Sequence, residues 1–293
     1  MLPSTERTSR FVDGRIRLHY LDAGRGKPVI LLHGFPETHR SWDLQIDALA
    51  GAGFRAITPD LRGYGESELP RGGYDLDSLA SDVVALIDAL GVSRVNLVGH
   101  DWGGAIAWHL ATHHAQRLER VVILDCPHPA LMARALQRNP VQRRRSWYMF
   151  FFQLPVLPEL WLTRNEGRNL ARMFRTGSPG EAAVPAQLIE AQKRALLAPG
   201  RIRGALAYYR TAFRSGLPEL VRGRRQPVRP IDVPITLIWG VDDSCLGPEL
   251  IDGTERFAPL LTVHRLEAAG HFVHQERPDE VNRLLLEALA RSP

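Results

Sequence analysis

The sequence of 293 residues predicts an α/β fold, in which helices cover both faces of a mostly parallel β-sheet. Two observations support this prediction. Short apolar runs alternate along the chain with longer segments of helical spacing, which is typical of parallel strands joined by crossover helices. One long stretch in the second half lacks strand patterns, which indicates a helical unit inserted into the alternation.

The expected strands are short and the expected helices are amphipathic. Residues 15–21 alternate between apolar and polar side chains, whereas the later runs are more continuously apolar, as buried strands are. The first long helical pattern ends at Gly91, a suitable C-cap. We expect strands at residues 15–21, 28–32, 55–58, 95–98, 121–124, 235–239 and 262–265, and helices at residues 76–90, 104–114 and 279–290.

The stretch without strand patterns is rich in arginine, aromatic residues and helical spacing, as in residues 186–197 and 204–213. We therefore expect a helical cap (lid) at residues 128–229. The core on either side of it would comprise residues 1–127 and 230–293. A chain of this length is sufficient for one large domain with such an insertion.

The composition is that of an ordinary globular protein, with 44% hydrophobic and 24% charged residues. The formal net charge is +5, and only two of the basic residues are lysines. Two arginine runs stand out, at residues 143–145 and 222–225. Neither belongs to a binding motif or is interleaved with aromatic residues. We therefore expect a solvated surface, with neither a nucleic acid nor a membrane as partner.

Several patterns bear on location and metal content. Cys126 and Cys245 form no disulfide framework, and residues 1–12 contain no apolar signal segment. Prolines interrupt the most apolar stretch, which is too short to span a bilayer, so we expect a cytoplasmic protein. The oligomeric state, a monomer or a homodimer, does not follow from the sequence. His109 and His113 are four residues apart but lack the adjacent glutamate of a zinc helix. We expect no metal and no cofactor.

The most informative motif is Gly99-His100-Asp101-Trp102-Gly103-Gly104, which lies between an expected strand and an expected helix. Glycines at these positions permit the sharp turn of a nucleophile elbow, which projects one side chain into a cleft. Serine usually occupies that position, but here it is Asp101. A carboxylate nucleophile forms an alkyl ester with a strained ring or a carbon–halogen bond. The alternative is that Asp101 only caps the helix that follows.

Two later segments supply an acid and a base. His271 follows the last expected strand, and Asp242 and Asp243 follow the strand before it. The order nucleophile, acid, histidine is that of α/β-hydrolases. Asp243 has the usual spacing for the acid, and Asp242 is the second choice. The acid would orient His271, which would deprotonate a water molecule.

An oxyanion hole is expected from two backbone N–H groups. The turn His33-Gly34-Phe35-Pro36 directly follows an expected strand, so one N–H from this turn would lie near the elbow. The N–H of Trp102 would supply the second donor. Together they would stabilise the tetrahedral intermediate formed when water attacks an ester on Asp101. Phe35 and Trp102, together with Phe272, are also the expected substrate-binding residues.

Taken together, the motifs resemble the epoxide hydrolase family of the α/β-hydrolase superfamily. They comprise His33-Gly34-Phe35-Pro36, Arg62-Gly63-Tyr64-Gly65-Glu66-Ser67, the aspartate elbow, Pro127-His128-Pro129, and Gly270-His271-Phe272 with Gln275-Glu276. The resemblance covers both ends of the chain. It implies a core with an inserted cap, and two cap tyrosines that hydrogen-bond the epoxide oxygen. Tyr209 matches that pattern, and Tyr148 matches it more loosely.

The resemblance implies a cofactor-independent hydrolase that converts a small apolar epoxide and water into a vicinal diol. Asp101 would form a covalent ester, with Tyr209 and Tyr148 protonating the oxygen. His271 and Asp243 would then activate the water that cleaves the ester. The natural epoxide, its stereochemistry and the position of attack do not follow from the sequence.

Other interpretations remain open at this point. Haloalkane dehalogenases share the aspartate elbow, but they typically have asparagine where this chain has Phe35. Fluoroacetate dehalogenases place arginine after the nucleophile, where this chain has Trp102. A ligand-binding module on a hydrolase fold is a non-catalytic alternative, although a complete triad has little purpose there. Both cap tyrosines could also serve only as packing aromatics.

Overall fold

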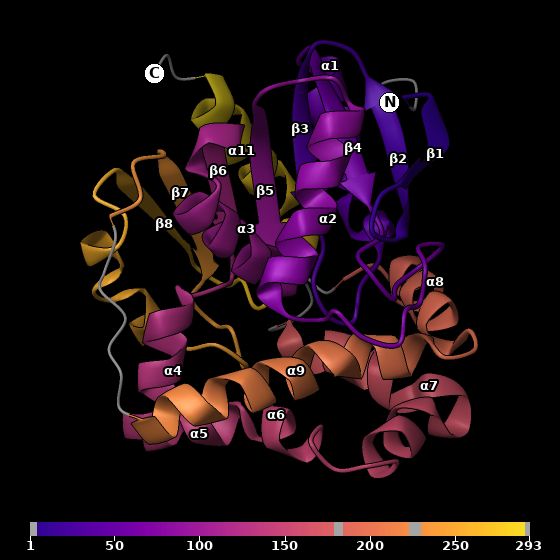
Figure 1. Cartoon of the computed structure of the whole chain (residues 1–293), viewed down its shortest axis with the longest axis vertical. Helices are drawn as coiled ribbons and strands as arrows, with labels where there is room; N and C mark the ends of the chain where they lie inside the picture. The colour runs from indigo at the N-terminus through magenta and orange to yellow at the C-terminus, as the bar shows by residue number, and fades with distance from the viewer. Residues whose placement is uncertain (1–4, 179–183, 223–229, 291–293) are drawn as a thin grey trace.

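The computed structural model describes residues 5–178, 184–222 and 230–290 (Figure 1). Its centre is an eight-stranded sheet in the order β1-β2-β4-β3-β5-β6-β7-β8. β2 pairs antiparallel with β1 and with β4, and the remaining pairs are parallel. The strands are β1 (Arg7–Asp13), β2 (Arg17–Gly24), β3 (Lys27–Leu32), β4 (Phe54–Pro59), β5 (Val95–His100), β6 (Leu118–Leu124), β7 (Ile235–Gly240) and β8 (Leu261–Leu266).

Helices cover both faces of this sheet. The core α-helices are α1 (Asp43–Gly51), α2 (Leu76–Ala89), α3 (Trp102–His113), α10 (Val273–Glu276) and α11 (Pro278–Ala290). Four 3-10 helices lie in the connections, namely η1 (His39–Trp42), η2 (Ala115–Arg117), η3 (Pro248–Ile251) and η4 (Thr254–Arg256). The predicted mostly parallel α/β architecture is confirmed.

The apolar alternation of the central strands produces two core layers. In β3, Ile30 and Leu32 point into the layer under α2 and α3, whereas Val29 and Leu31 point into the layer under α1 and α11. All four side chains are fully buried. A strand buried on both faces reads as a continuous apolar run, which explains why this segment was recognisable from the sequence.

Between β6 and β7 the described chain forms helices only. They are α4 (Pro129–Arg138), α5 (Pro140–Arg145), α6 (Trp147–Phe151), α7 (Leu157–Gly177), α8 (Ala186–Leu197) and α9 (Arg201–Arg222). These helices lie at one end of the sheet, with α5, α6 and α7 farthest from it (Figure 1). We call the described residues 128–178 and 184–222 the cap. The predicted boundaries at residues 128 and 229 stay a prediction, and part of the second arginine run lies outside the described residues.

Two elements at the start of the chain were not predicted. The edge strand β1 is mostly exposed, and its polar sequence lacks the apolar pattern of a buried strand. α1 is short and has a weak apolar pattern, although Ile46 and Leu49 are buried in the core. Both elements are stabilised by contacts with β2, β4 and α11 rather than by their own sequence pattern.

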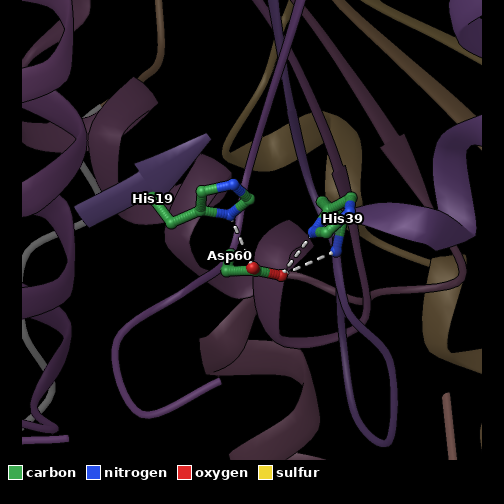
Figure 2. Close-up of side chains that lie close together, drawn as sticks. All are labelled: His19, His39 and Asp60. Carbon is green, nitrogen blue, oxygen red and sulfur yellow. Dashed lines mark hydrogen bonds and ion pairs between the residues drawn. The ribbon is translucent and has the colours of Figure 1, made fainter. Parts of the chain in front are cut away.

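A buried carboxylate anchors the turn that follows β4. Asp60 accepts hydrogen bonds from the imidazoles of His19 and His39, at 2.8 and 2.9 Å (Figure 2). The backbone N–H groups of His39 and Glu66 donate to the same carboxylate, at 3.1 and 3.0 Å. Four donors therefore hold β2, η1 and the turn after β4 together around Asp60. This turn matters for the cap, because Arg201 of α9 donates to the carbonyl of Ser67.

None of the described helices has the length and apolar character needed to span a bilayer.

Candidate active site

The predicted elbow is present at the end of β5. Asp101 has φ 49° and ψ −115°, and α3 begins at the next residue. A positive φ is costly for a residue other than glycine and is typical of functional sites. Glycine is required beside it, because a Cβ at Gly103 would collide with the carbonyl of Leu32 in β3. Close packing of α3 against the sheet thus fixes the direction of the Asp101 side chain.

The carboxylate of Asp101 has a different neighbour at each oxygen. The backbone N–H of Phe35 donates to Oδ1 at 2.7 Å. On the other side, His271 Nε2 lies 3.7 Å from Oδ2. The side chain of Asp101 is 13% exposed, so it lies in a nearly closed site. The turn after β3 and the loop after β8 therefore meet at this residue, as the sequence predicts.

His271 is oriented by Asp243 and not by Asp242. His271 Nδ1 lies 2.8 Å from Asp243 Oδ2, and both groups are buried. The other oxygen of Asp243 accepts the N–H groups of Cys245 and Leu246, at 2.6 and 2.9 Å. Asp242 is exposed. The carboxylate of Asp243 is thus held in a fixed position by three donors.

The charges around His271 favour its protonated form in the resting site. Burial alone would lower the pKa of His271. The charge of the Asp243 carboxylate, the nearby Asp101 carboxylate and the hydrogen bond with Asp243 together outweigh burial, so the pKa of His271 lies well above its usual value. Loss of the negative charge on Asp101 would remove one of the groups that raise this pKa.

Tyr209 of α9 lies over the nucleophile, at the centre of an aromatic cluster. Its ring centre is 5.4 Å from that of Phe35, 5.1 Å from that of Trp102 and 6.0 Å from that of Tyr148. The neighbouring Tyr208 points elsewhere, because its hydroxyl donates to the Arg62 carbonyl at 2.8 Å. The structure thus brings Tyr209, and not Tyr208, to the candidate site.

Both cap tyrosines are held as neutral phenols. Burial raises the pKa of Tyr148 and of Tyr209 well above the ordinary value, and the negative charge of Asp101 raises the Tyr209 pKa further. A phenol with a raised pKa keeps its proton at neutral pH and remains available as a hydrogen-bond donor. Tyr148 lies on α6, where its ring packs against Phe152 with centres 5.7 Å apart.

Phe272 lies beside the base rather than above the nucleophile. Its ring packs on Phe174 of α7, with ring centres 4.7 Å apart, and lies 5.2 Å from the ring of His271. The side chain is 2% exposed. Among the three predicted substrate-binding residues, Phe35 and Trp102 therefore adjoin the nucleophile and Tyr209. Phe272 mainly supports the loop that carries His271.

One buried network connects three loops of the candidate site and was not predicted from the sequence. Glu37 accepts the N–H of Gly34 at 3.1 Å, and its carboxylate also contacts His100 at 2.8 Å and Gln275. The other nitrogen of His100 lies 2.7 Å from the carbonyl of His271. Both nitrogens of His100 thus face oxygen atoms, one of Glu37 and one of the His271 carbonyl. A usable signal was the glutamate directly after the His-Gly-Phe-Pro turn, in an otherwise buried segment.

The charges of this network support that arrangement. Burial alone would raise the pKa of Glu37, but His100 and His274 together hold it well below its usual value. His274 itself has a pKa lowered to about 4, mainly by burial, despite its contact with Glu37. An ionised glutamate paired with His100 is therefore the favoured state in this buried position.

Two clusters in the described part of the chain combine the side-chain types that bind metals. They are His19, His39 and Asp60, and Glu37, His100 and His274. In each, the histidines are hydrogen-bonded or ion-paired with the carboxylate, and backbone N–H groups donate to it as well. Hydrogen bonding accounts for the proximity of these groups. The prediction that the chain needs no metal stays a prediction.

Comparison with known proteins agrees with this geometry. The model of the alpha/beta hydrolase fold family matches residues 27–278. The AB hydrolase superfamily protein YfhM of Bacillus subtilis is 36% identical over 94% of this chain and 94% of its own length. Human epoxide hydrolase 4 is 35% identical over 94% of this chain and 76% of its own length.

Solved structures are similar over nearly the whole chain. The epoxide hydrolase of Bacillus megaterium, in complex with an inhibitor, superimposes with a TM-score of 0.86 at 32% identity. The match covers 97% of this chain and 100% of that chain. An epoxide hydrolase from Vigna radiata gives a TM-score of 0.81 at 28% identity. This chain therefore belongs to the epoxide hydrolase family of the alpha/beta hydrolase fold.

Proposed function

We propose that this chain hydrolyses small apolar epoxides to vicinal diols through a covalent ester on Asp101. The proposal rests on the groups that surround the Asp101 carboxylate. Oδ1 is held by a backbone N–H, Oδ2 is open toward a histidine base, and the phenols of Tyr209 and Tyr148 lie on the cap side. Such a site supplies a nucleophile, a proton donor and a water-activating base together.

In the first half-reaction, Asp101 Oδ2 would attack one carbon of the epoxide ring. The carbon–oxygen bond breaks, and its electron pair goes to the departing oxygen. Tyr209 and Tyr148 would hydrogen-bond this oxygen and supply a proton, since an unprotonated alkoxide is a poor leaving group. Oδ1, which accepts the Phe35 N–H, would become the carbonyl oxygen of the ester.

In the second half-reaction, ester formation has removed the negative charge of Asp101, so His271 would give its extra proton to the tyrosinate left by the first step. Neutral His271 would then take a proton from water, and the resulting hydroxide would attack the carbonyl carbon of the ester. Negative charge then develops on Oδ1, where the Phe35 N–H already points. Trp102 is the first residue of α3, so its N–H has no acceptor within the helix and can serve as the second donor. Collapse of this intermediate breaks the bond between the carbonyl carbon and the substrate oxygen. That oxygen takes the remaining proton of the attacking water, so the diol is released and the Asp101 carboxylate and protonated His271 are restored.

The aromatic lining favours an apolar substrate and opposes a halide-binding role. Phe35, Trp102 and Tyr209 surround the nucleophile with ring faces and edges. A departing halide needs stabilising donors but no proton, so phenols held in their neutral form have most value for an epoxide oxygen. These residues therefore support the epoxide reaction over the dehalogenase alternative.

A single-turnover experiment in labelled water tests the covalent route. Enzyme in excess over styrene oxide, in ¹⁸O water, should give a first-turnover diol with unlabelled oxygen, because Oδ2 of Asp101 leaves with the product. The label should instead enter Asp101, and mass spectrometry of the peptide containing it would show this. Full label in the first diol would mean direct attack by water. Halide release from chloroalkanes, with no reaction on a panel of epoxides, would overturn the assigned reaction.

A further inference from the structure

A group of large apolar side chains lies exposed on the cap, away from the candidate active site. Each is between 40 and 61% exposed, and we call the group the outer patch. Its members come from α6, from the connection to α7, from the start of α7 and from α9: Trp147, Phe150, Leu154, Val156, Leu157, Leu160 and Phe213. α6 and α7 lie on the side of the molecule farthest from the sheet (Figure 1).

The outer patch is held together by defined contacts. The rings of Phe150 and Phe213 lie 6.0 Å apart, which connects α6 to α9. Arg210 of α9 donates to the carbonyls of Phe152 and Leu154, at 2.9 and 2.8 Å, and pairs with Glu159. These bonds fix the segment between α6 and α7 against α9. The apolar side chains are therefore presented on a fixed surface.

Residues 128–229 carry a strong positive net charge, whereas the rest of the chain carries a negative one. Residues 128–229 contain 19 of the 37 basic residues but only 5 of the 32 acidic residues, which gives them a net charge of +14. The rest of the chain has a net charge of −9. Exposed arginines lie close in sequence to the outer patch, including Arg143, Arg144, Arg164 and Arg214. The patch is thus an apolar surface within a strongly basic part of the protein.

We propose that the outer patch docks this protein on the surface of an anionic lipid bilayer. Apolar side chains that include tryptophan, combined with surrounding basic residues, are the two features that bind proteins to such a surface. A second copy of the chain fits less well, because two caps of charge +14 would repel each other. This proposal departs from the expectation, based on the arginine runs alone, of a solvated surface with no membrane partner. In the fold, apolar side chains that are dispersed in the sequence come together in the outer patch, close to these basic residues.

The position of α6 suggests how a substrate in the bilayer would reach the active site, an inference that rests on the proposed function. This helix carries Trp147 and Phe150 in the outer patch and Tyr148 in the candidate active site. An apolar epoxide dissolved in the bilayer would therefore reach the enzyme beside one of the two proton donors. The docking itself does not require catalysis and can be tested separately.

Flotation with vesicles tests the proposal on the full chain. Vesicles of phosphatidylcholine and phosphatidylglycerol in equal amounts should bind the protein at low salt, and vesicles of phosphatidylcholine alone should bind it much less. The double variant Trp147→Ser/Leu160→Ser should bind at least tenfold more weakly, on the order expected for removing two apolar side chains. The variant Arg144→Glu/Arg214→Glu should also lose at least about tenfold.

Matched variants outside the cap provide controls. Leu44→Ser/Leu260→Ser removes two exposed apolar side chains from the core, and Arg25→Glu/Arg71→Glu makes the same change in net charge there. Both should bind anionic vesicles like the wild type. Asp101→Asn should also bind normally although it is inactive, so a failure of the proposed reaction would not be mistaken for a failure of docking. Circular dichroism and thermal unfolding check that each variant is folded.

The proposal is overturned if the wild type fails to float with anionic vesicles at low salt. It is also overturned if the patch variants and the core variants bind equally well. Two further outcomes would assign the surface to another partner. One is a dimer, seen by sedimentation, that Trp147→Ser abolishes in a protein that does not bind vesicles. The other is binding to duplex DNA without any binding to vesicles.

Discussion

The two oxygens of Asp101 face different groups, and this difference assigns them different roles. Oδ1 accepts the Phe35 N–H at 2.7 Å, while Oδ2 faces His271 Nε2 at 3.7 Å. In the proposed reaction, Oδ2 bonds to the substrate and Oδ1 carries the charge of the tetrahedral intermediate. The donor for that charge is already in place in the resting site, so no rearrangement is needed when the charge appears.

We expect His271→Gln to form the ester and then stall, because the base acts only in the second half-reaction. Hydrolysis of the ester should slow by on the order of 10²–10⁴-fold. Mass spectrometry after exposure to an epoxide should show the protein with one added substrate mass. Asp101→Asn is the control and should show no adduct. Normal turnover by a His271→Gln variant without an adduct would contradict the role of His271.

Replacement of Tyr209 tests the proton donor, with its neighbour as a matched control. Tyr209→Phe should slow the formation of the ester from an epoxide by on the order of 10²–10⁴-fold in single turnover. Tyr208→Phe should leave this step nearly unchanged, because the Tyr208 hydroxyl donates to the Arg62 carbonyl and not into the site. A double Tyr148→Phe/Tyr209→Phe variant with wild-type epoxide kinetics would rule out the tyrosines as donors.

The candidate residues of the site were predictable because their chemistry and chain order are distinctive. Asp101, His271 and Asp243 each follow a strand that reads clearly in the sequence, and strand ends meet at one edge of a parallel sheet. The Glu37–His100 pair was missed because its role depends on a contact between the turn after β3 and the elbow, 63 positions apart in sequence. Nothing in the local sequence of either residue specifies that partner.

At the scale of elements, the turn after β3 and the elbow after β5 are packed against each other. An ideal Cβ at Gly34 would lie 2.6 Å from Asp101 Oδ1 and closer still to the Cβ of Asp101. Neither residue can move far, because Gly34 donates to Glu37 and Asp101 is fixed by α3. The closeness of these two elements creates the bond between the Phe35 N–H and the nucleophile.

We therefore expect Gly34→Ala to reduce turnover by on the order of 10²-fold, since a displacement near 1 Å in a reacting group has effects of this size. The variant should still fold, and its far-ultraviolet circular dichroism should match the wild type. Gly72→Ala is the control, because a Cβ there meets no atom within 4 Å. Equal steady-state rates for Gly34→Ala and Gly72→Ala would show that the close approach has no catalytic importance.

Elements differed in how well the sequence predicted them, for physical reasons. Buried strands such as β3 and β5 are specified by local apolar runs, so their positions were correct to within a few residues. β1 is exposed on most of its length and depends on pairing with β2. α7 changes direction at residues 164–167, where the backbone is not helical. Such features follow from tertiary contacts, which periodicity does not encode.

At the scale of the whole molecule, the candidate site lies where core and cap are joined by hydrogen bonds. Tyr208 donates to Arg62, Arg201 donates to Ser67, and the His271 N–H donates to the Gly177 carbonyl at the end of α7. Two of these contacts involve the turn that begins at Asp60 and ends at Ser67. The stability of this turn therefore affects both the fold and the seating of the cap.

The pKa of Asp60 predicts how stability depends on pH. Burial alone would raise it, but hydrogen bonds from His19 and His39 hold the pKa well below the usual 3.8. A carboxylate with a lowered pKa stabilises the fold above its unfolded pKa, and this contribution is lost as the pH falls below about 4. The wild type should thus lose urea resistance on acidification, from about pH 7 to about pH 3.

Asp60→Asn should be less stable at neutral pH by about 1–3 kcal/mol, since it weakens a buried hydrogen-bond network. Its urea midpoint should change less with acidification than that of the wild type, because the titrating group is gone. Asp252→Asn removes a carboxylate that is 77% exposed and should behave like the wild type. An identical pH dependence in wild type and Asp60→Asn would show that Asp60 does not contribute.

A second carboxyl group lies near Asp243, the proposed acid. Asp125 directly follows β6 and is fully buried. Its Oδ1 accepts the Gly240 N–H, and its Oδ2 has no hydrogen-bond partner among the described residues. Burial and the negative charge of Asp243 raise the pKa of Asp125 well above its ordinary value. While Asp243 is ionised, the neutral, protonated form of Asp125 is therefore favoured.

This arrangement places a second carboxylic acid where it could support the base. If Asp243 were replaced by a neutral residue, one charge that suppresses the ionisation of Asp125 would disappear, while the attraction of His271 would remain. The negative charge that supports the base could then pass from the end of β7 to the end of β6, an adjacent strand in the sheet. The acid would then come from an earlier strand of the chain, while the order nucleophile, acid, histidine would stay the same.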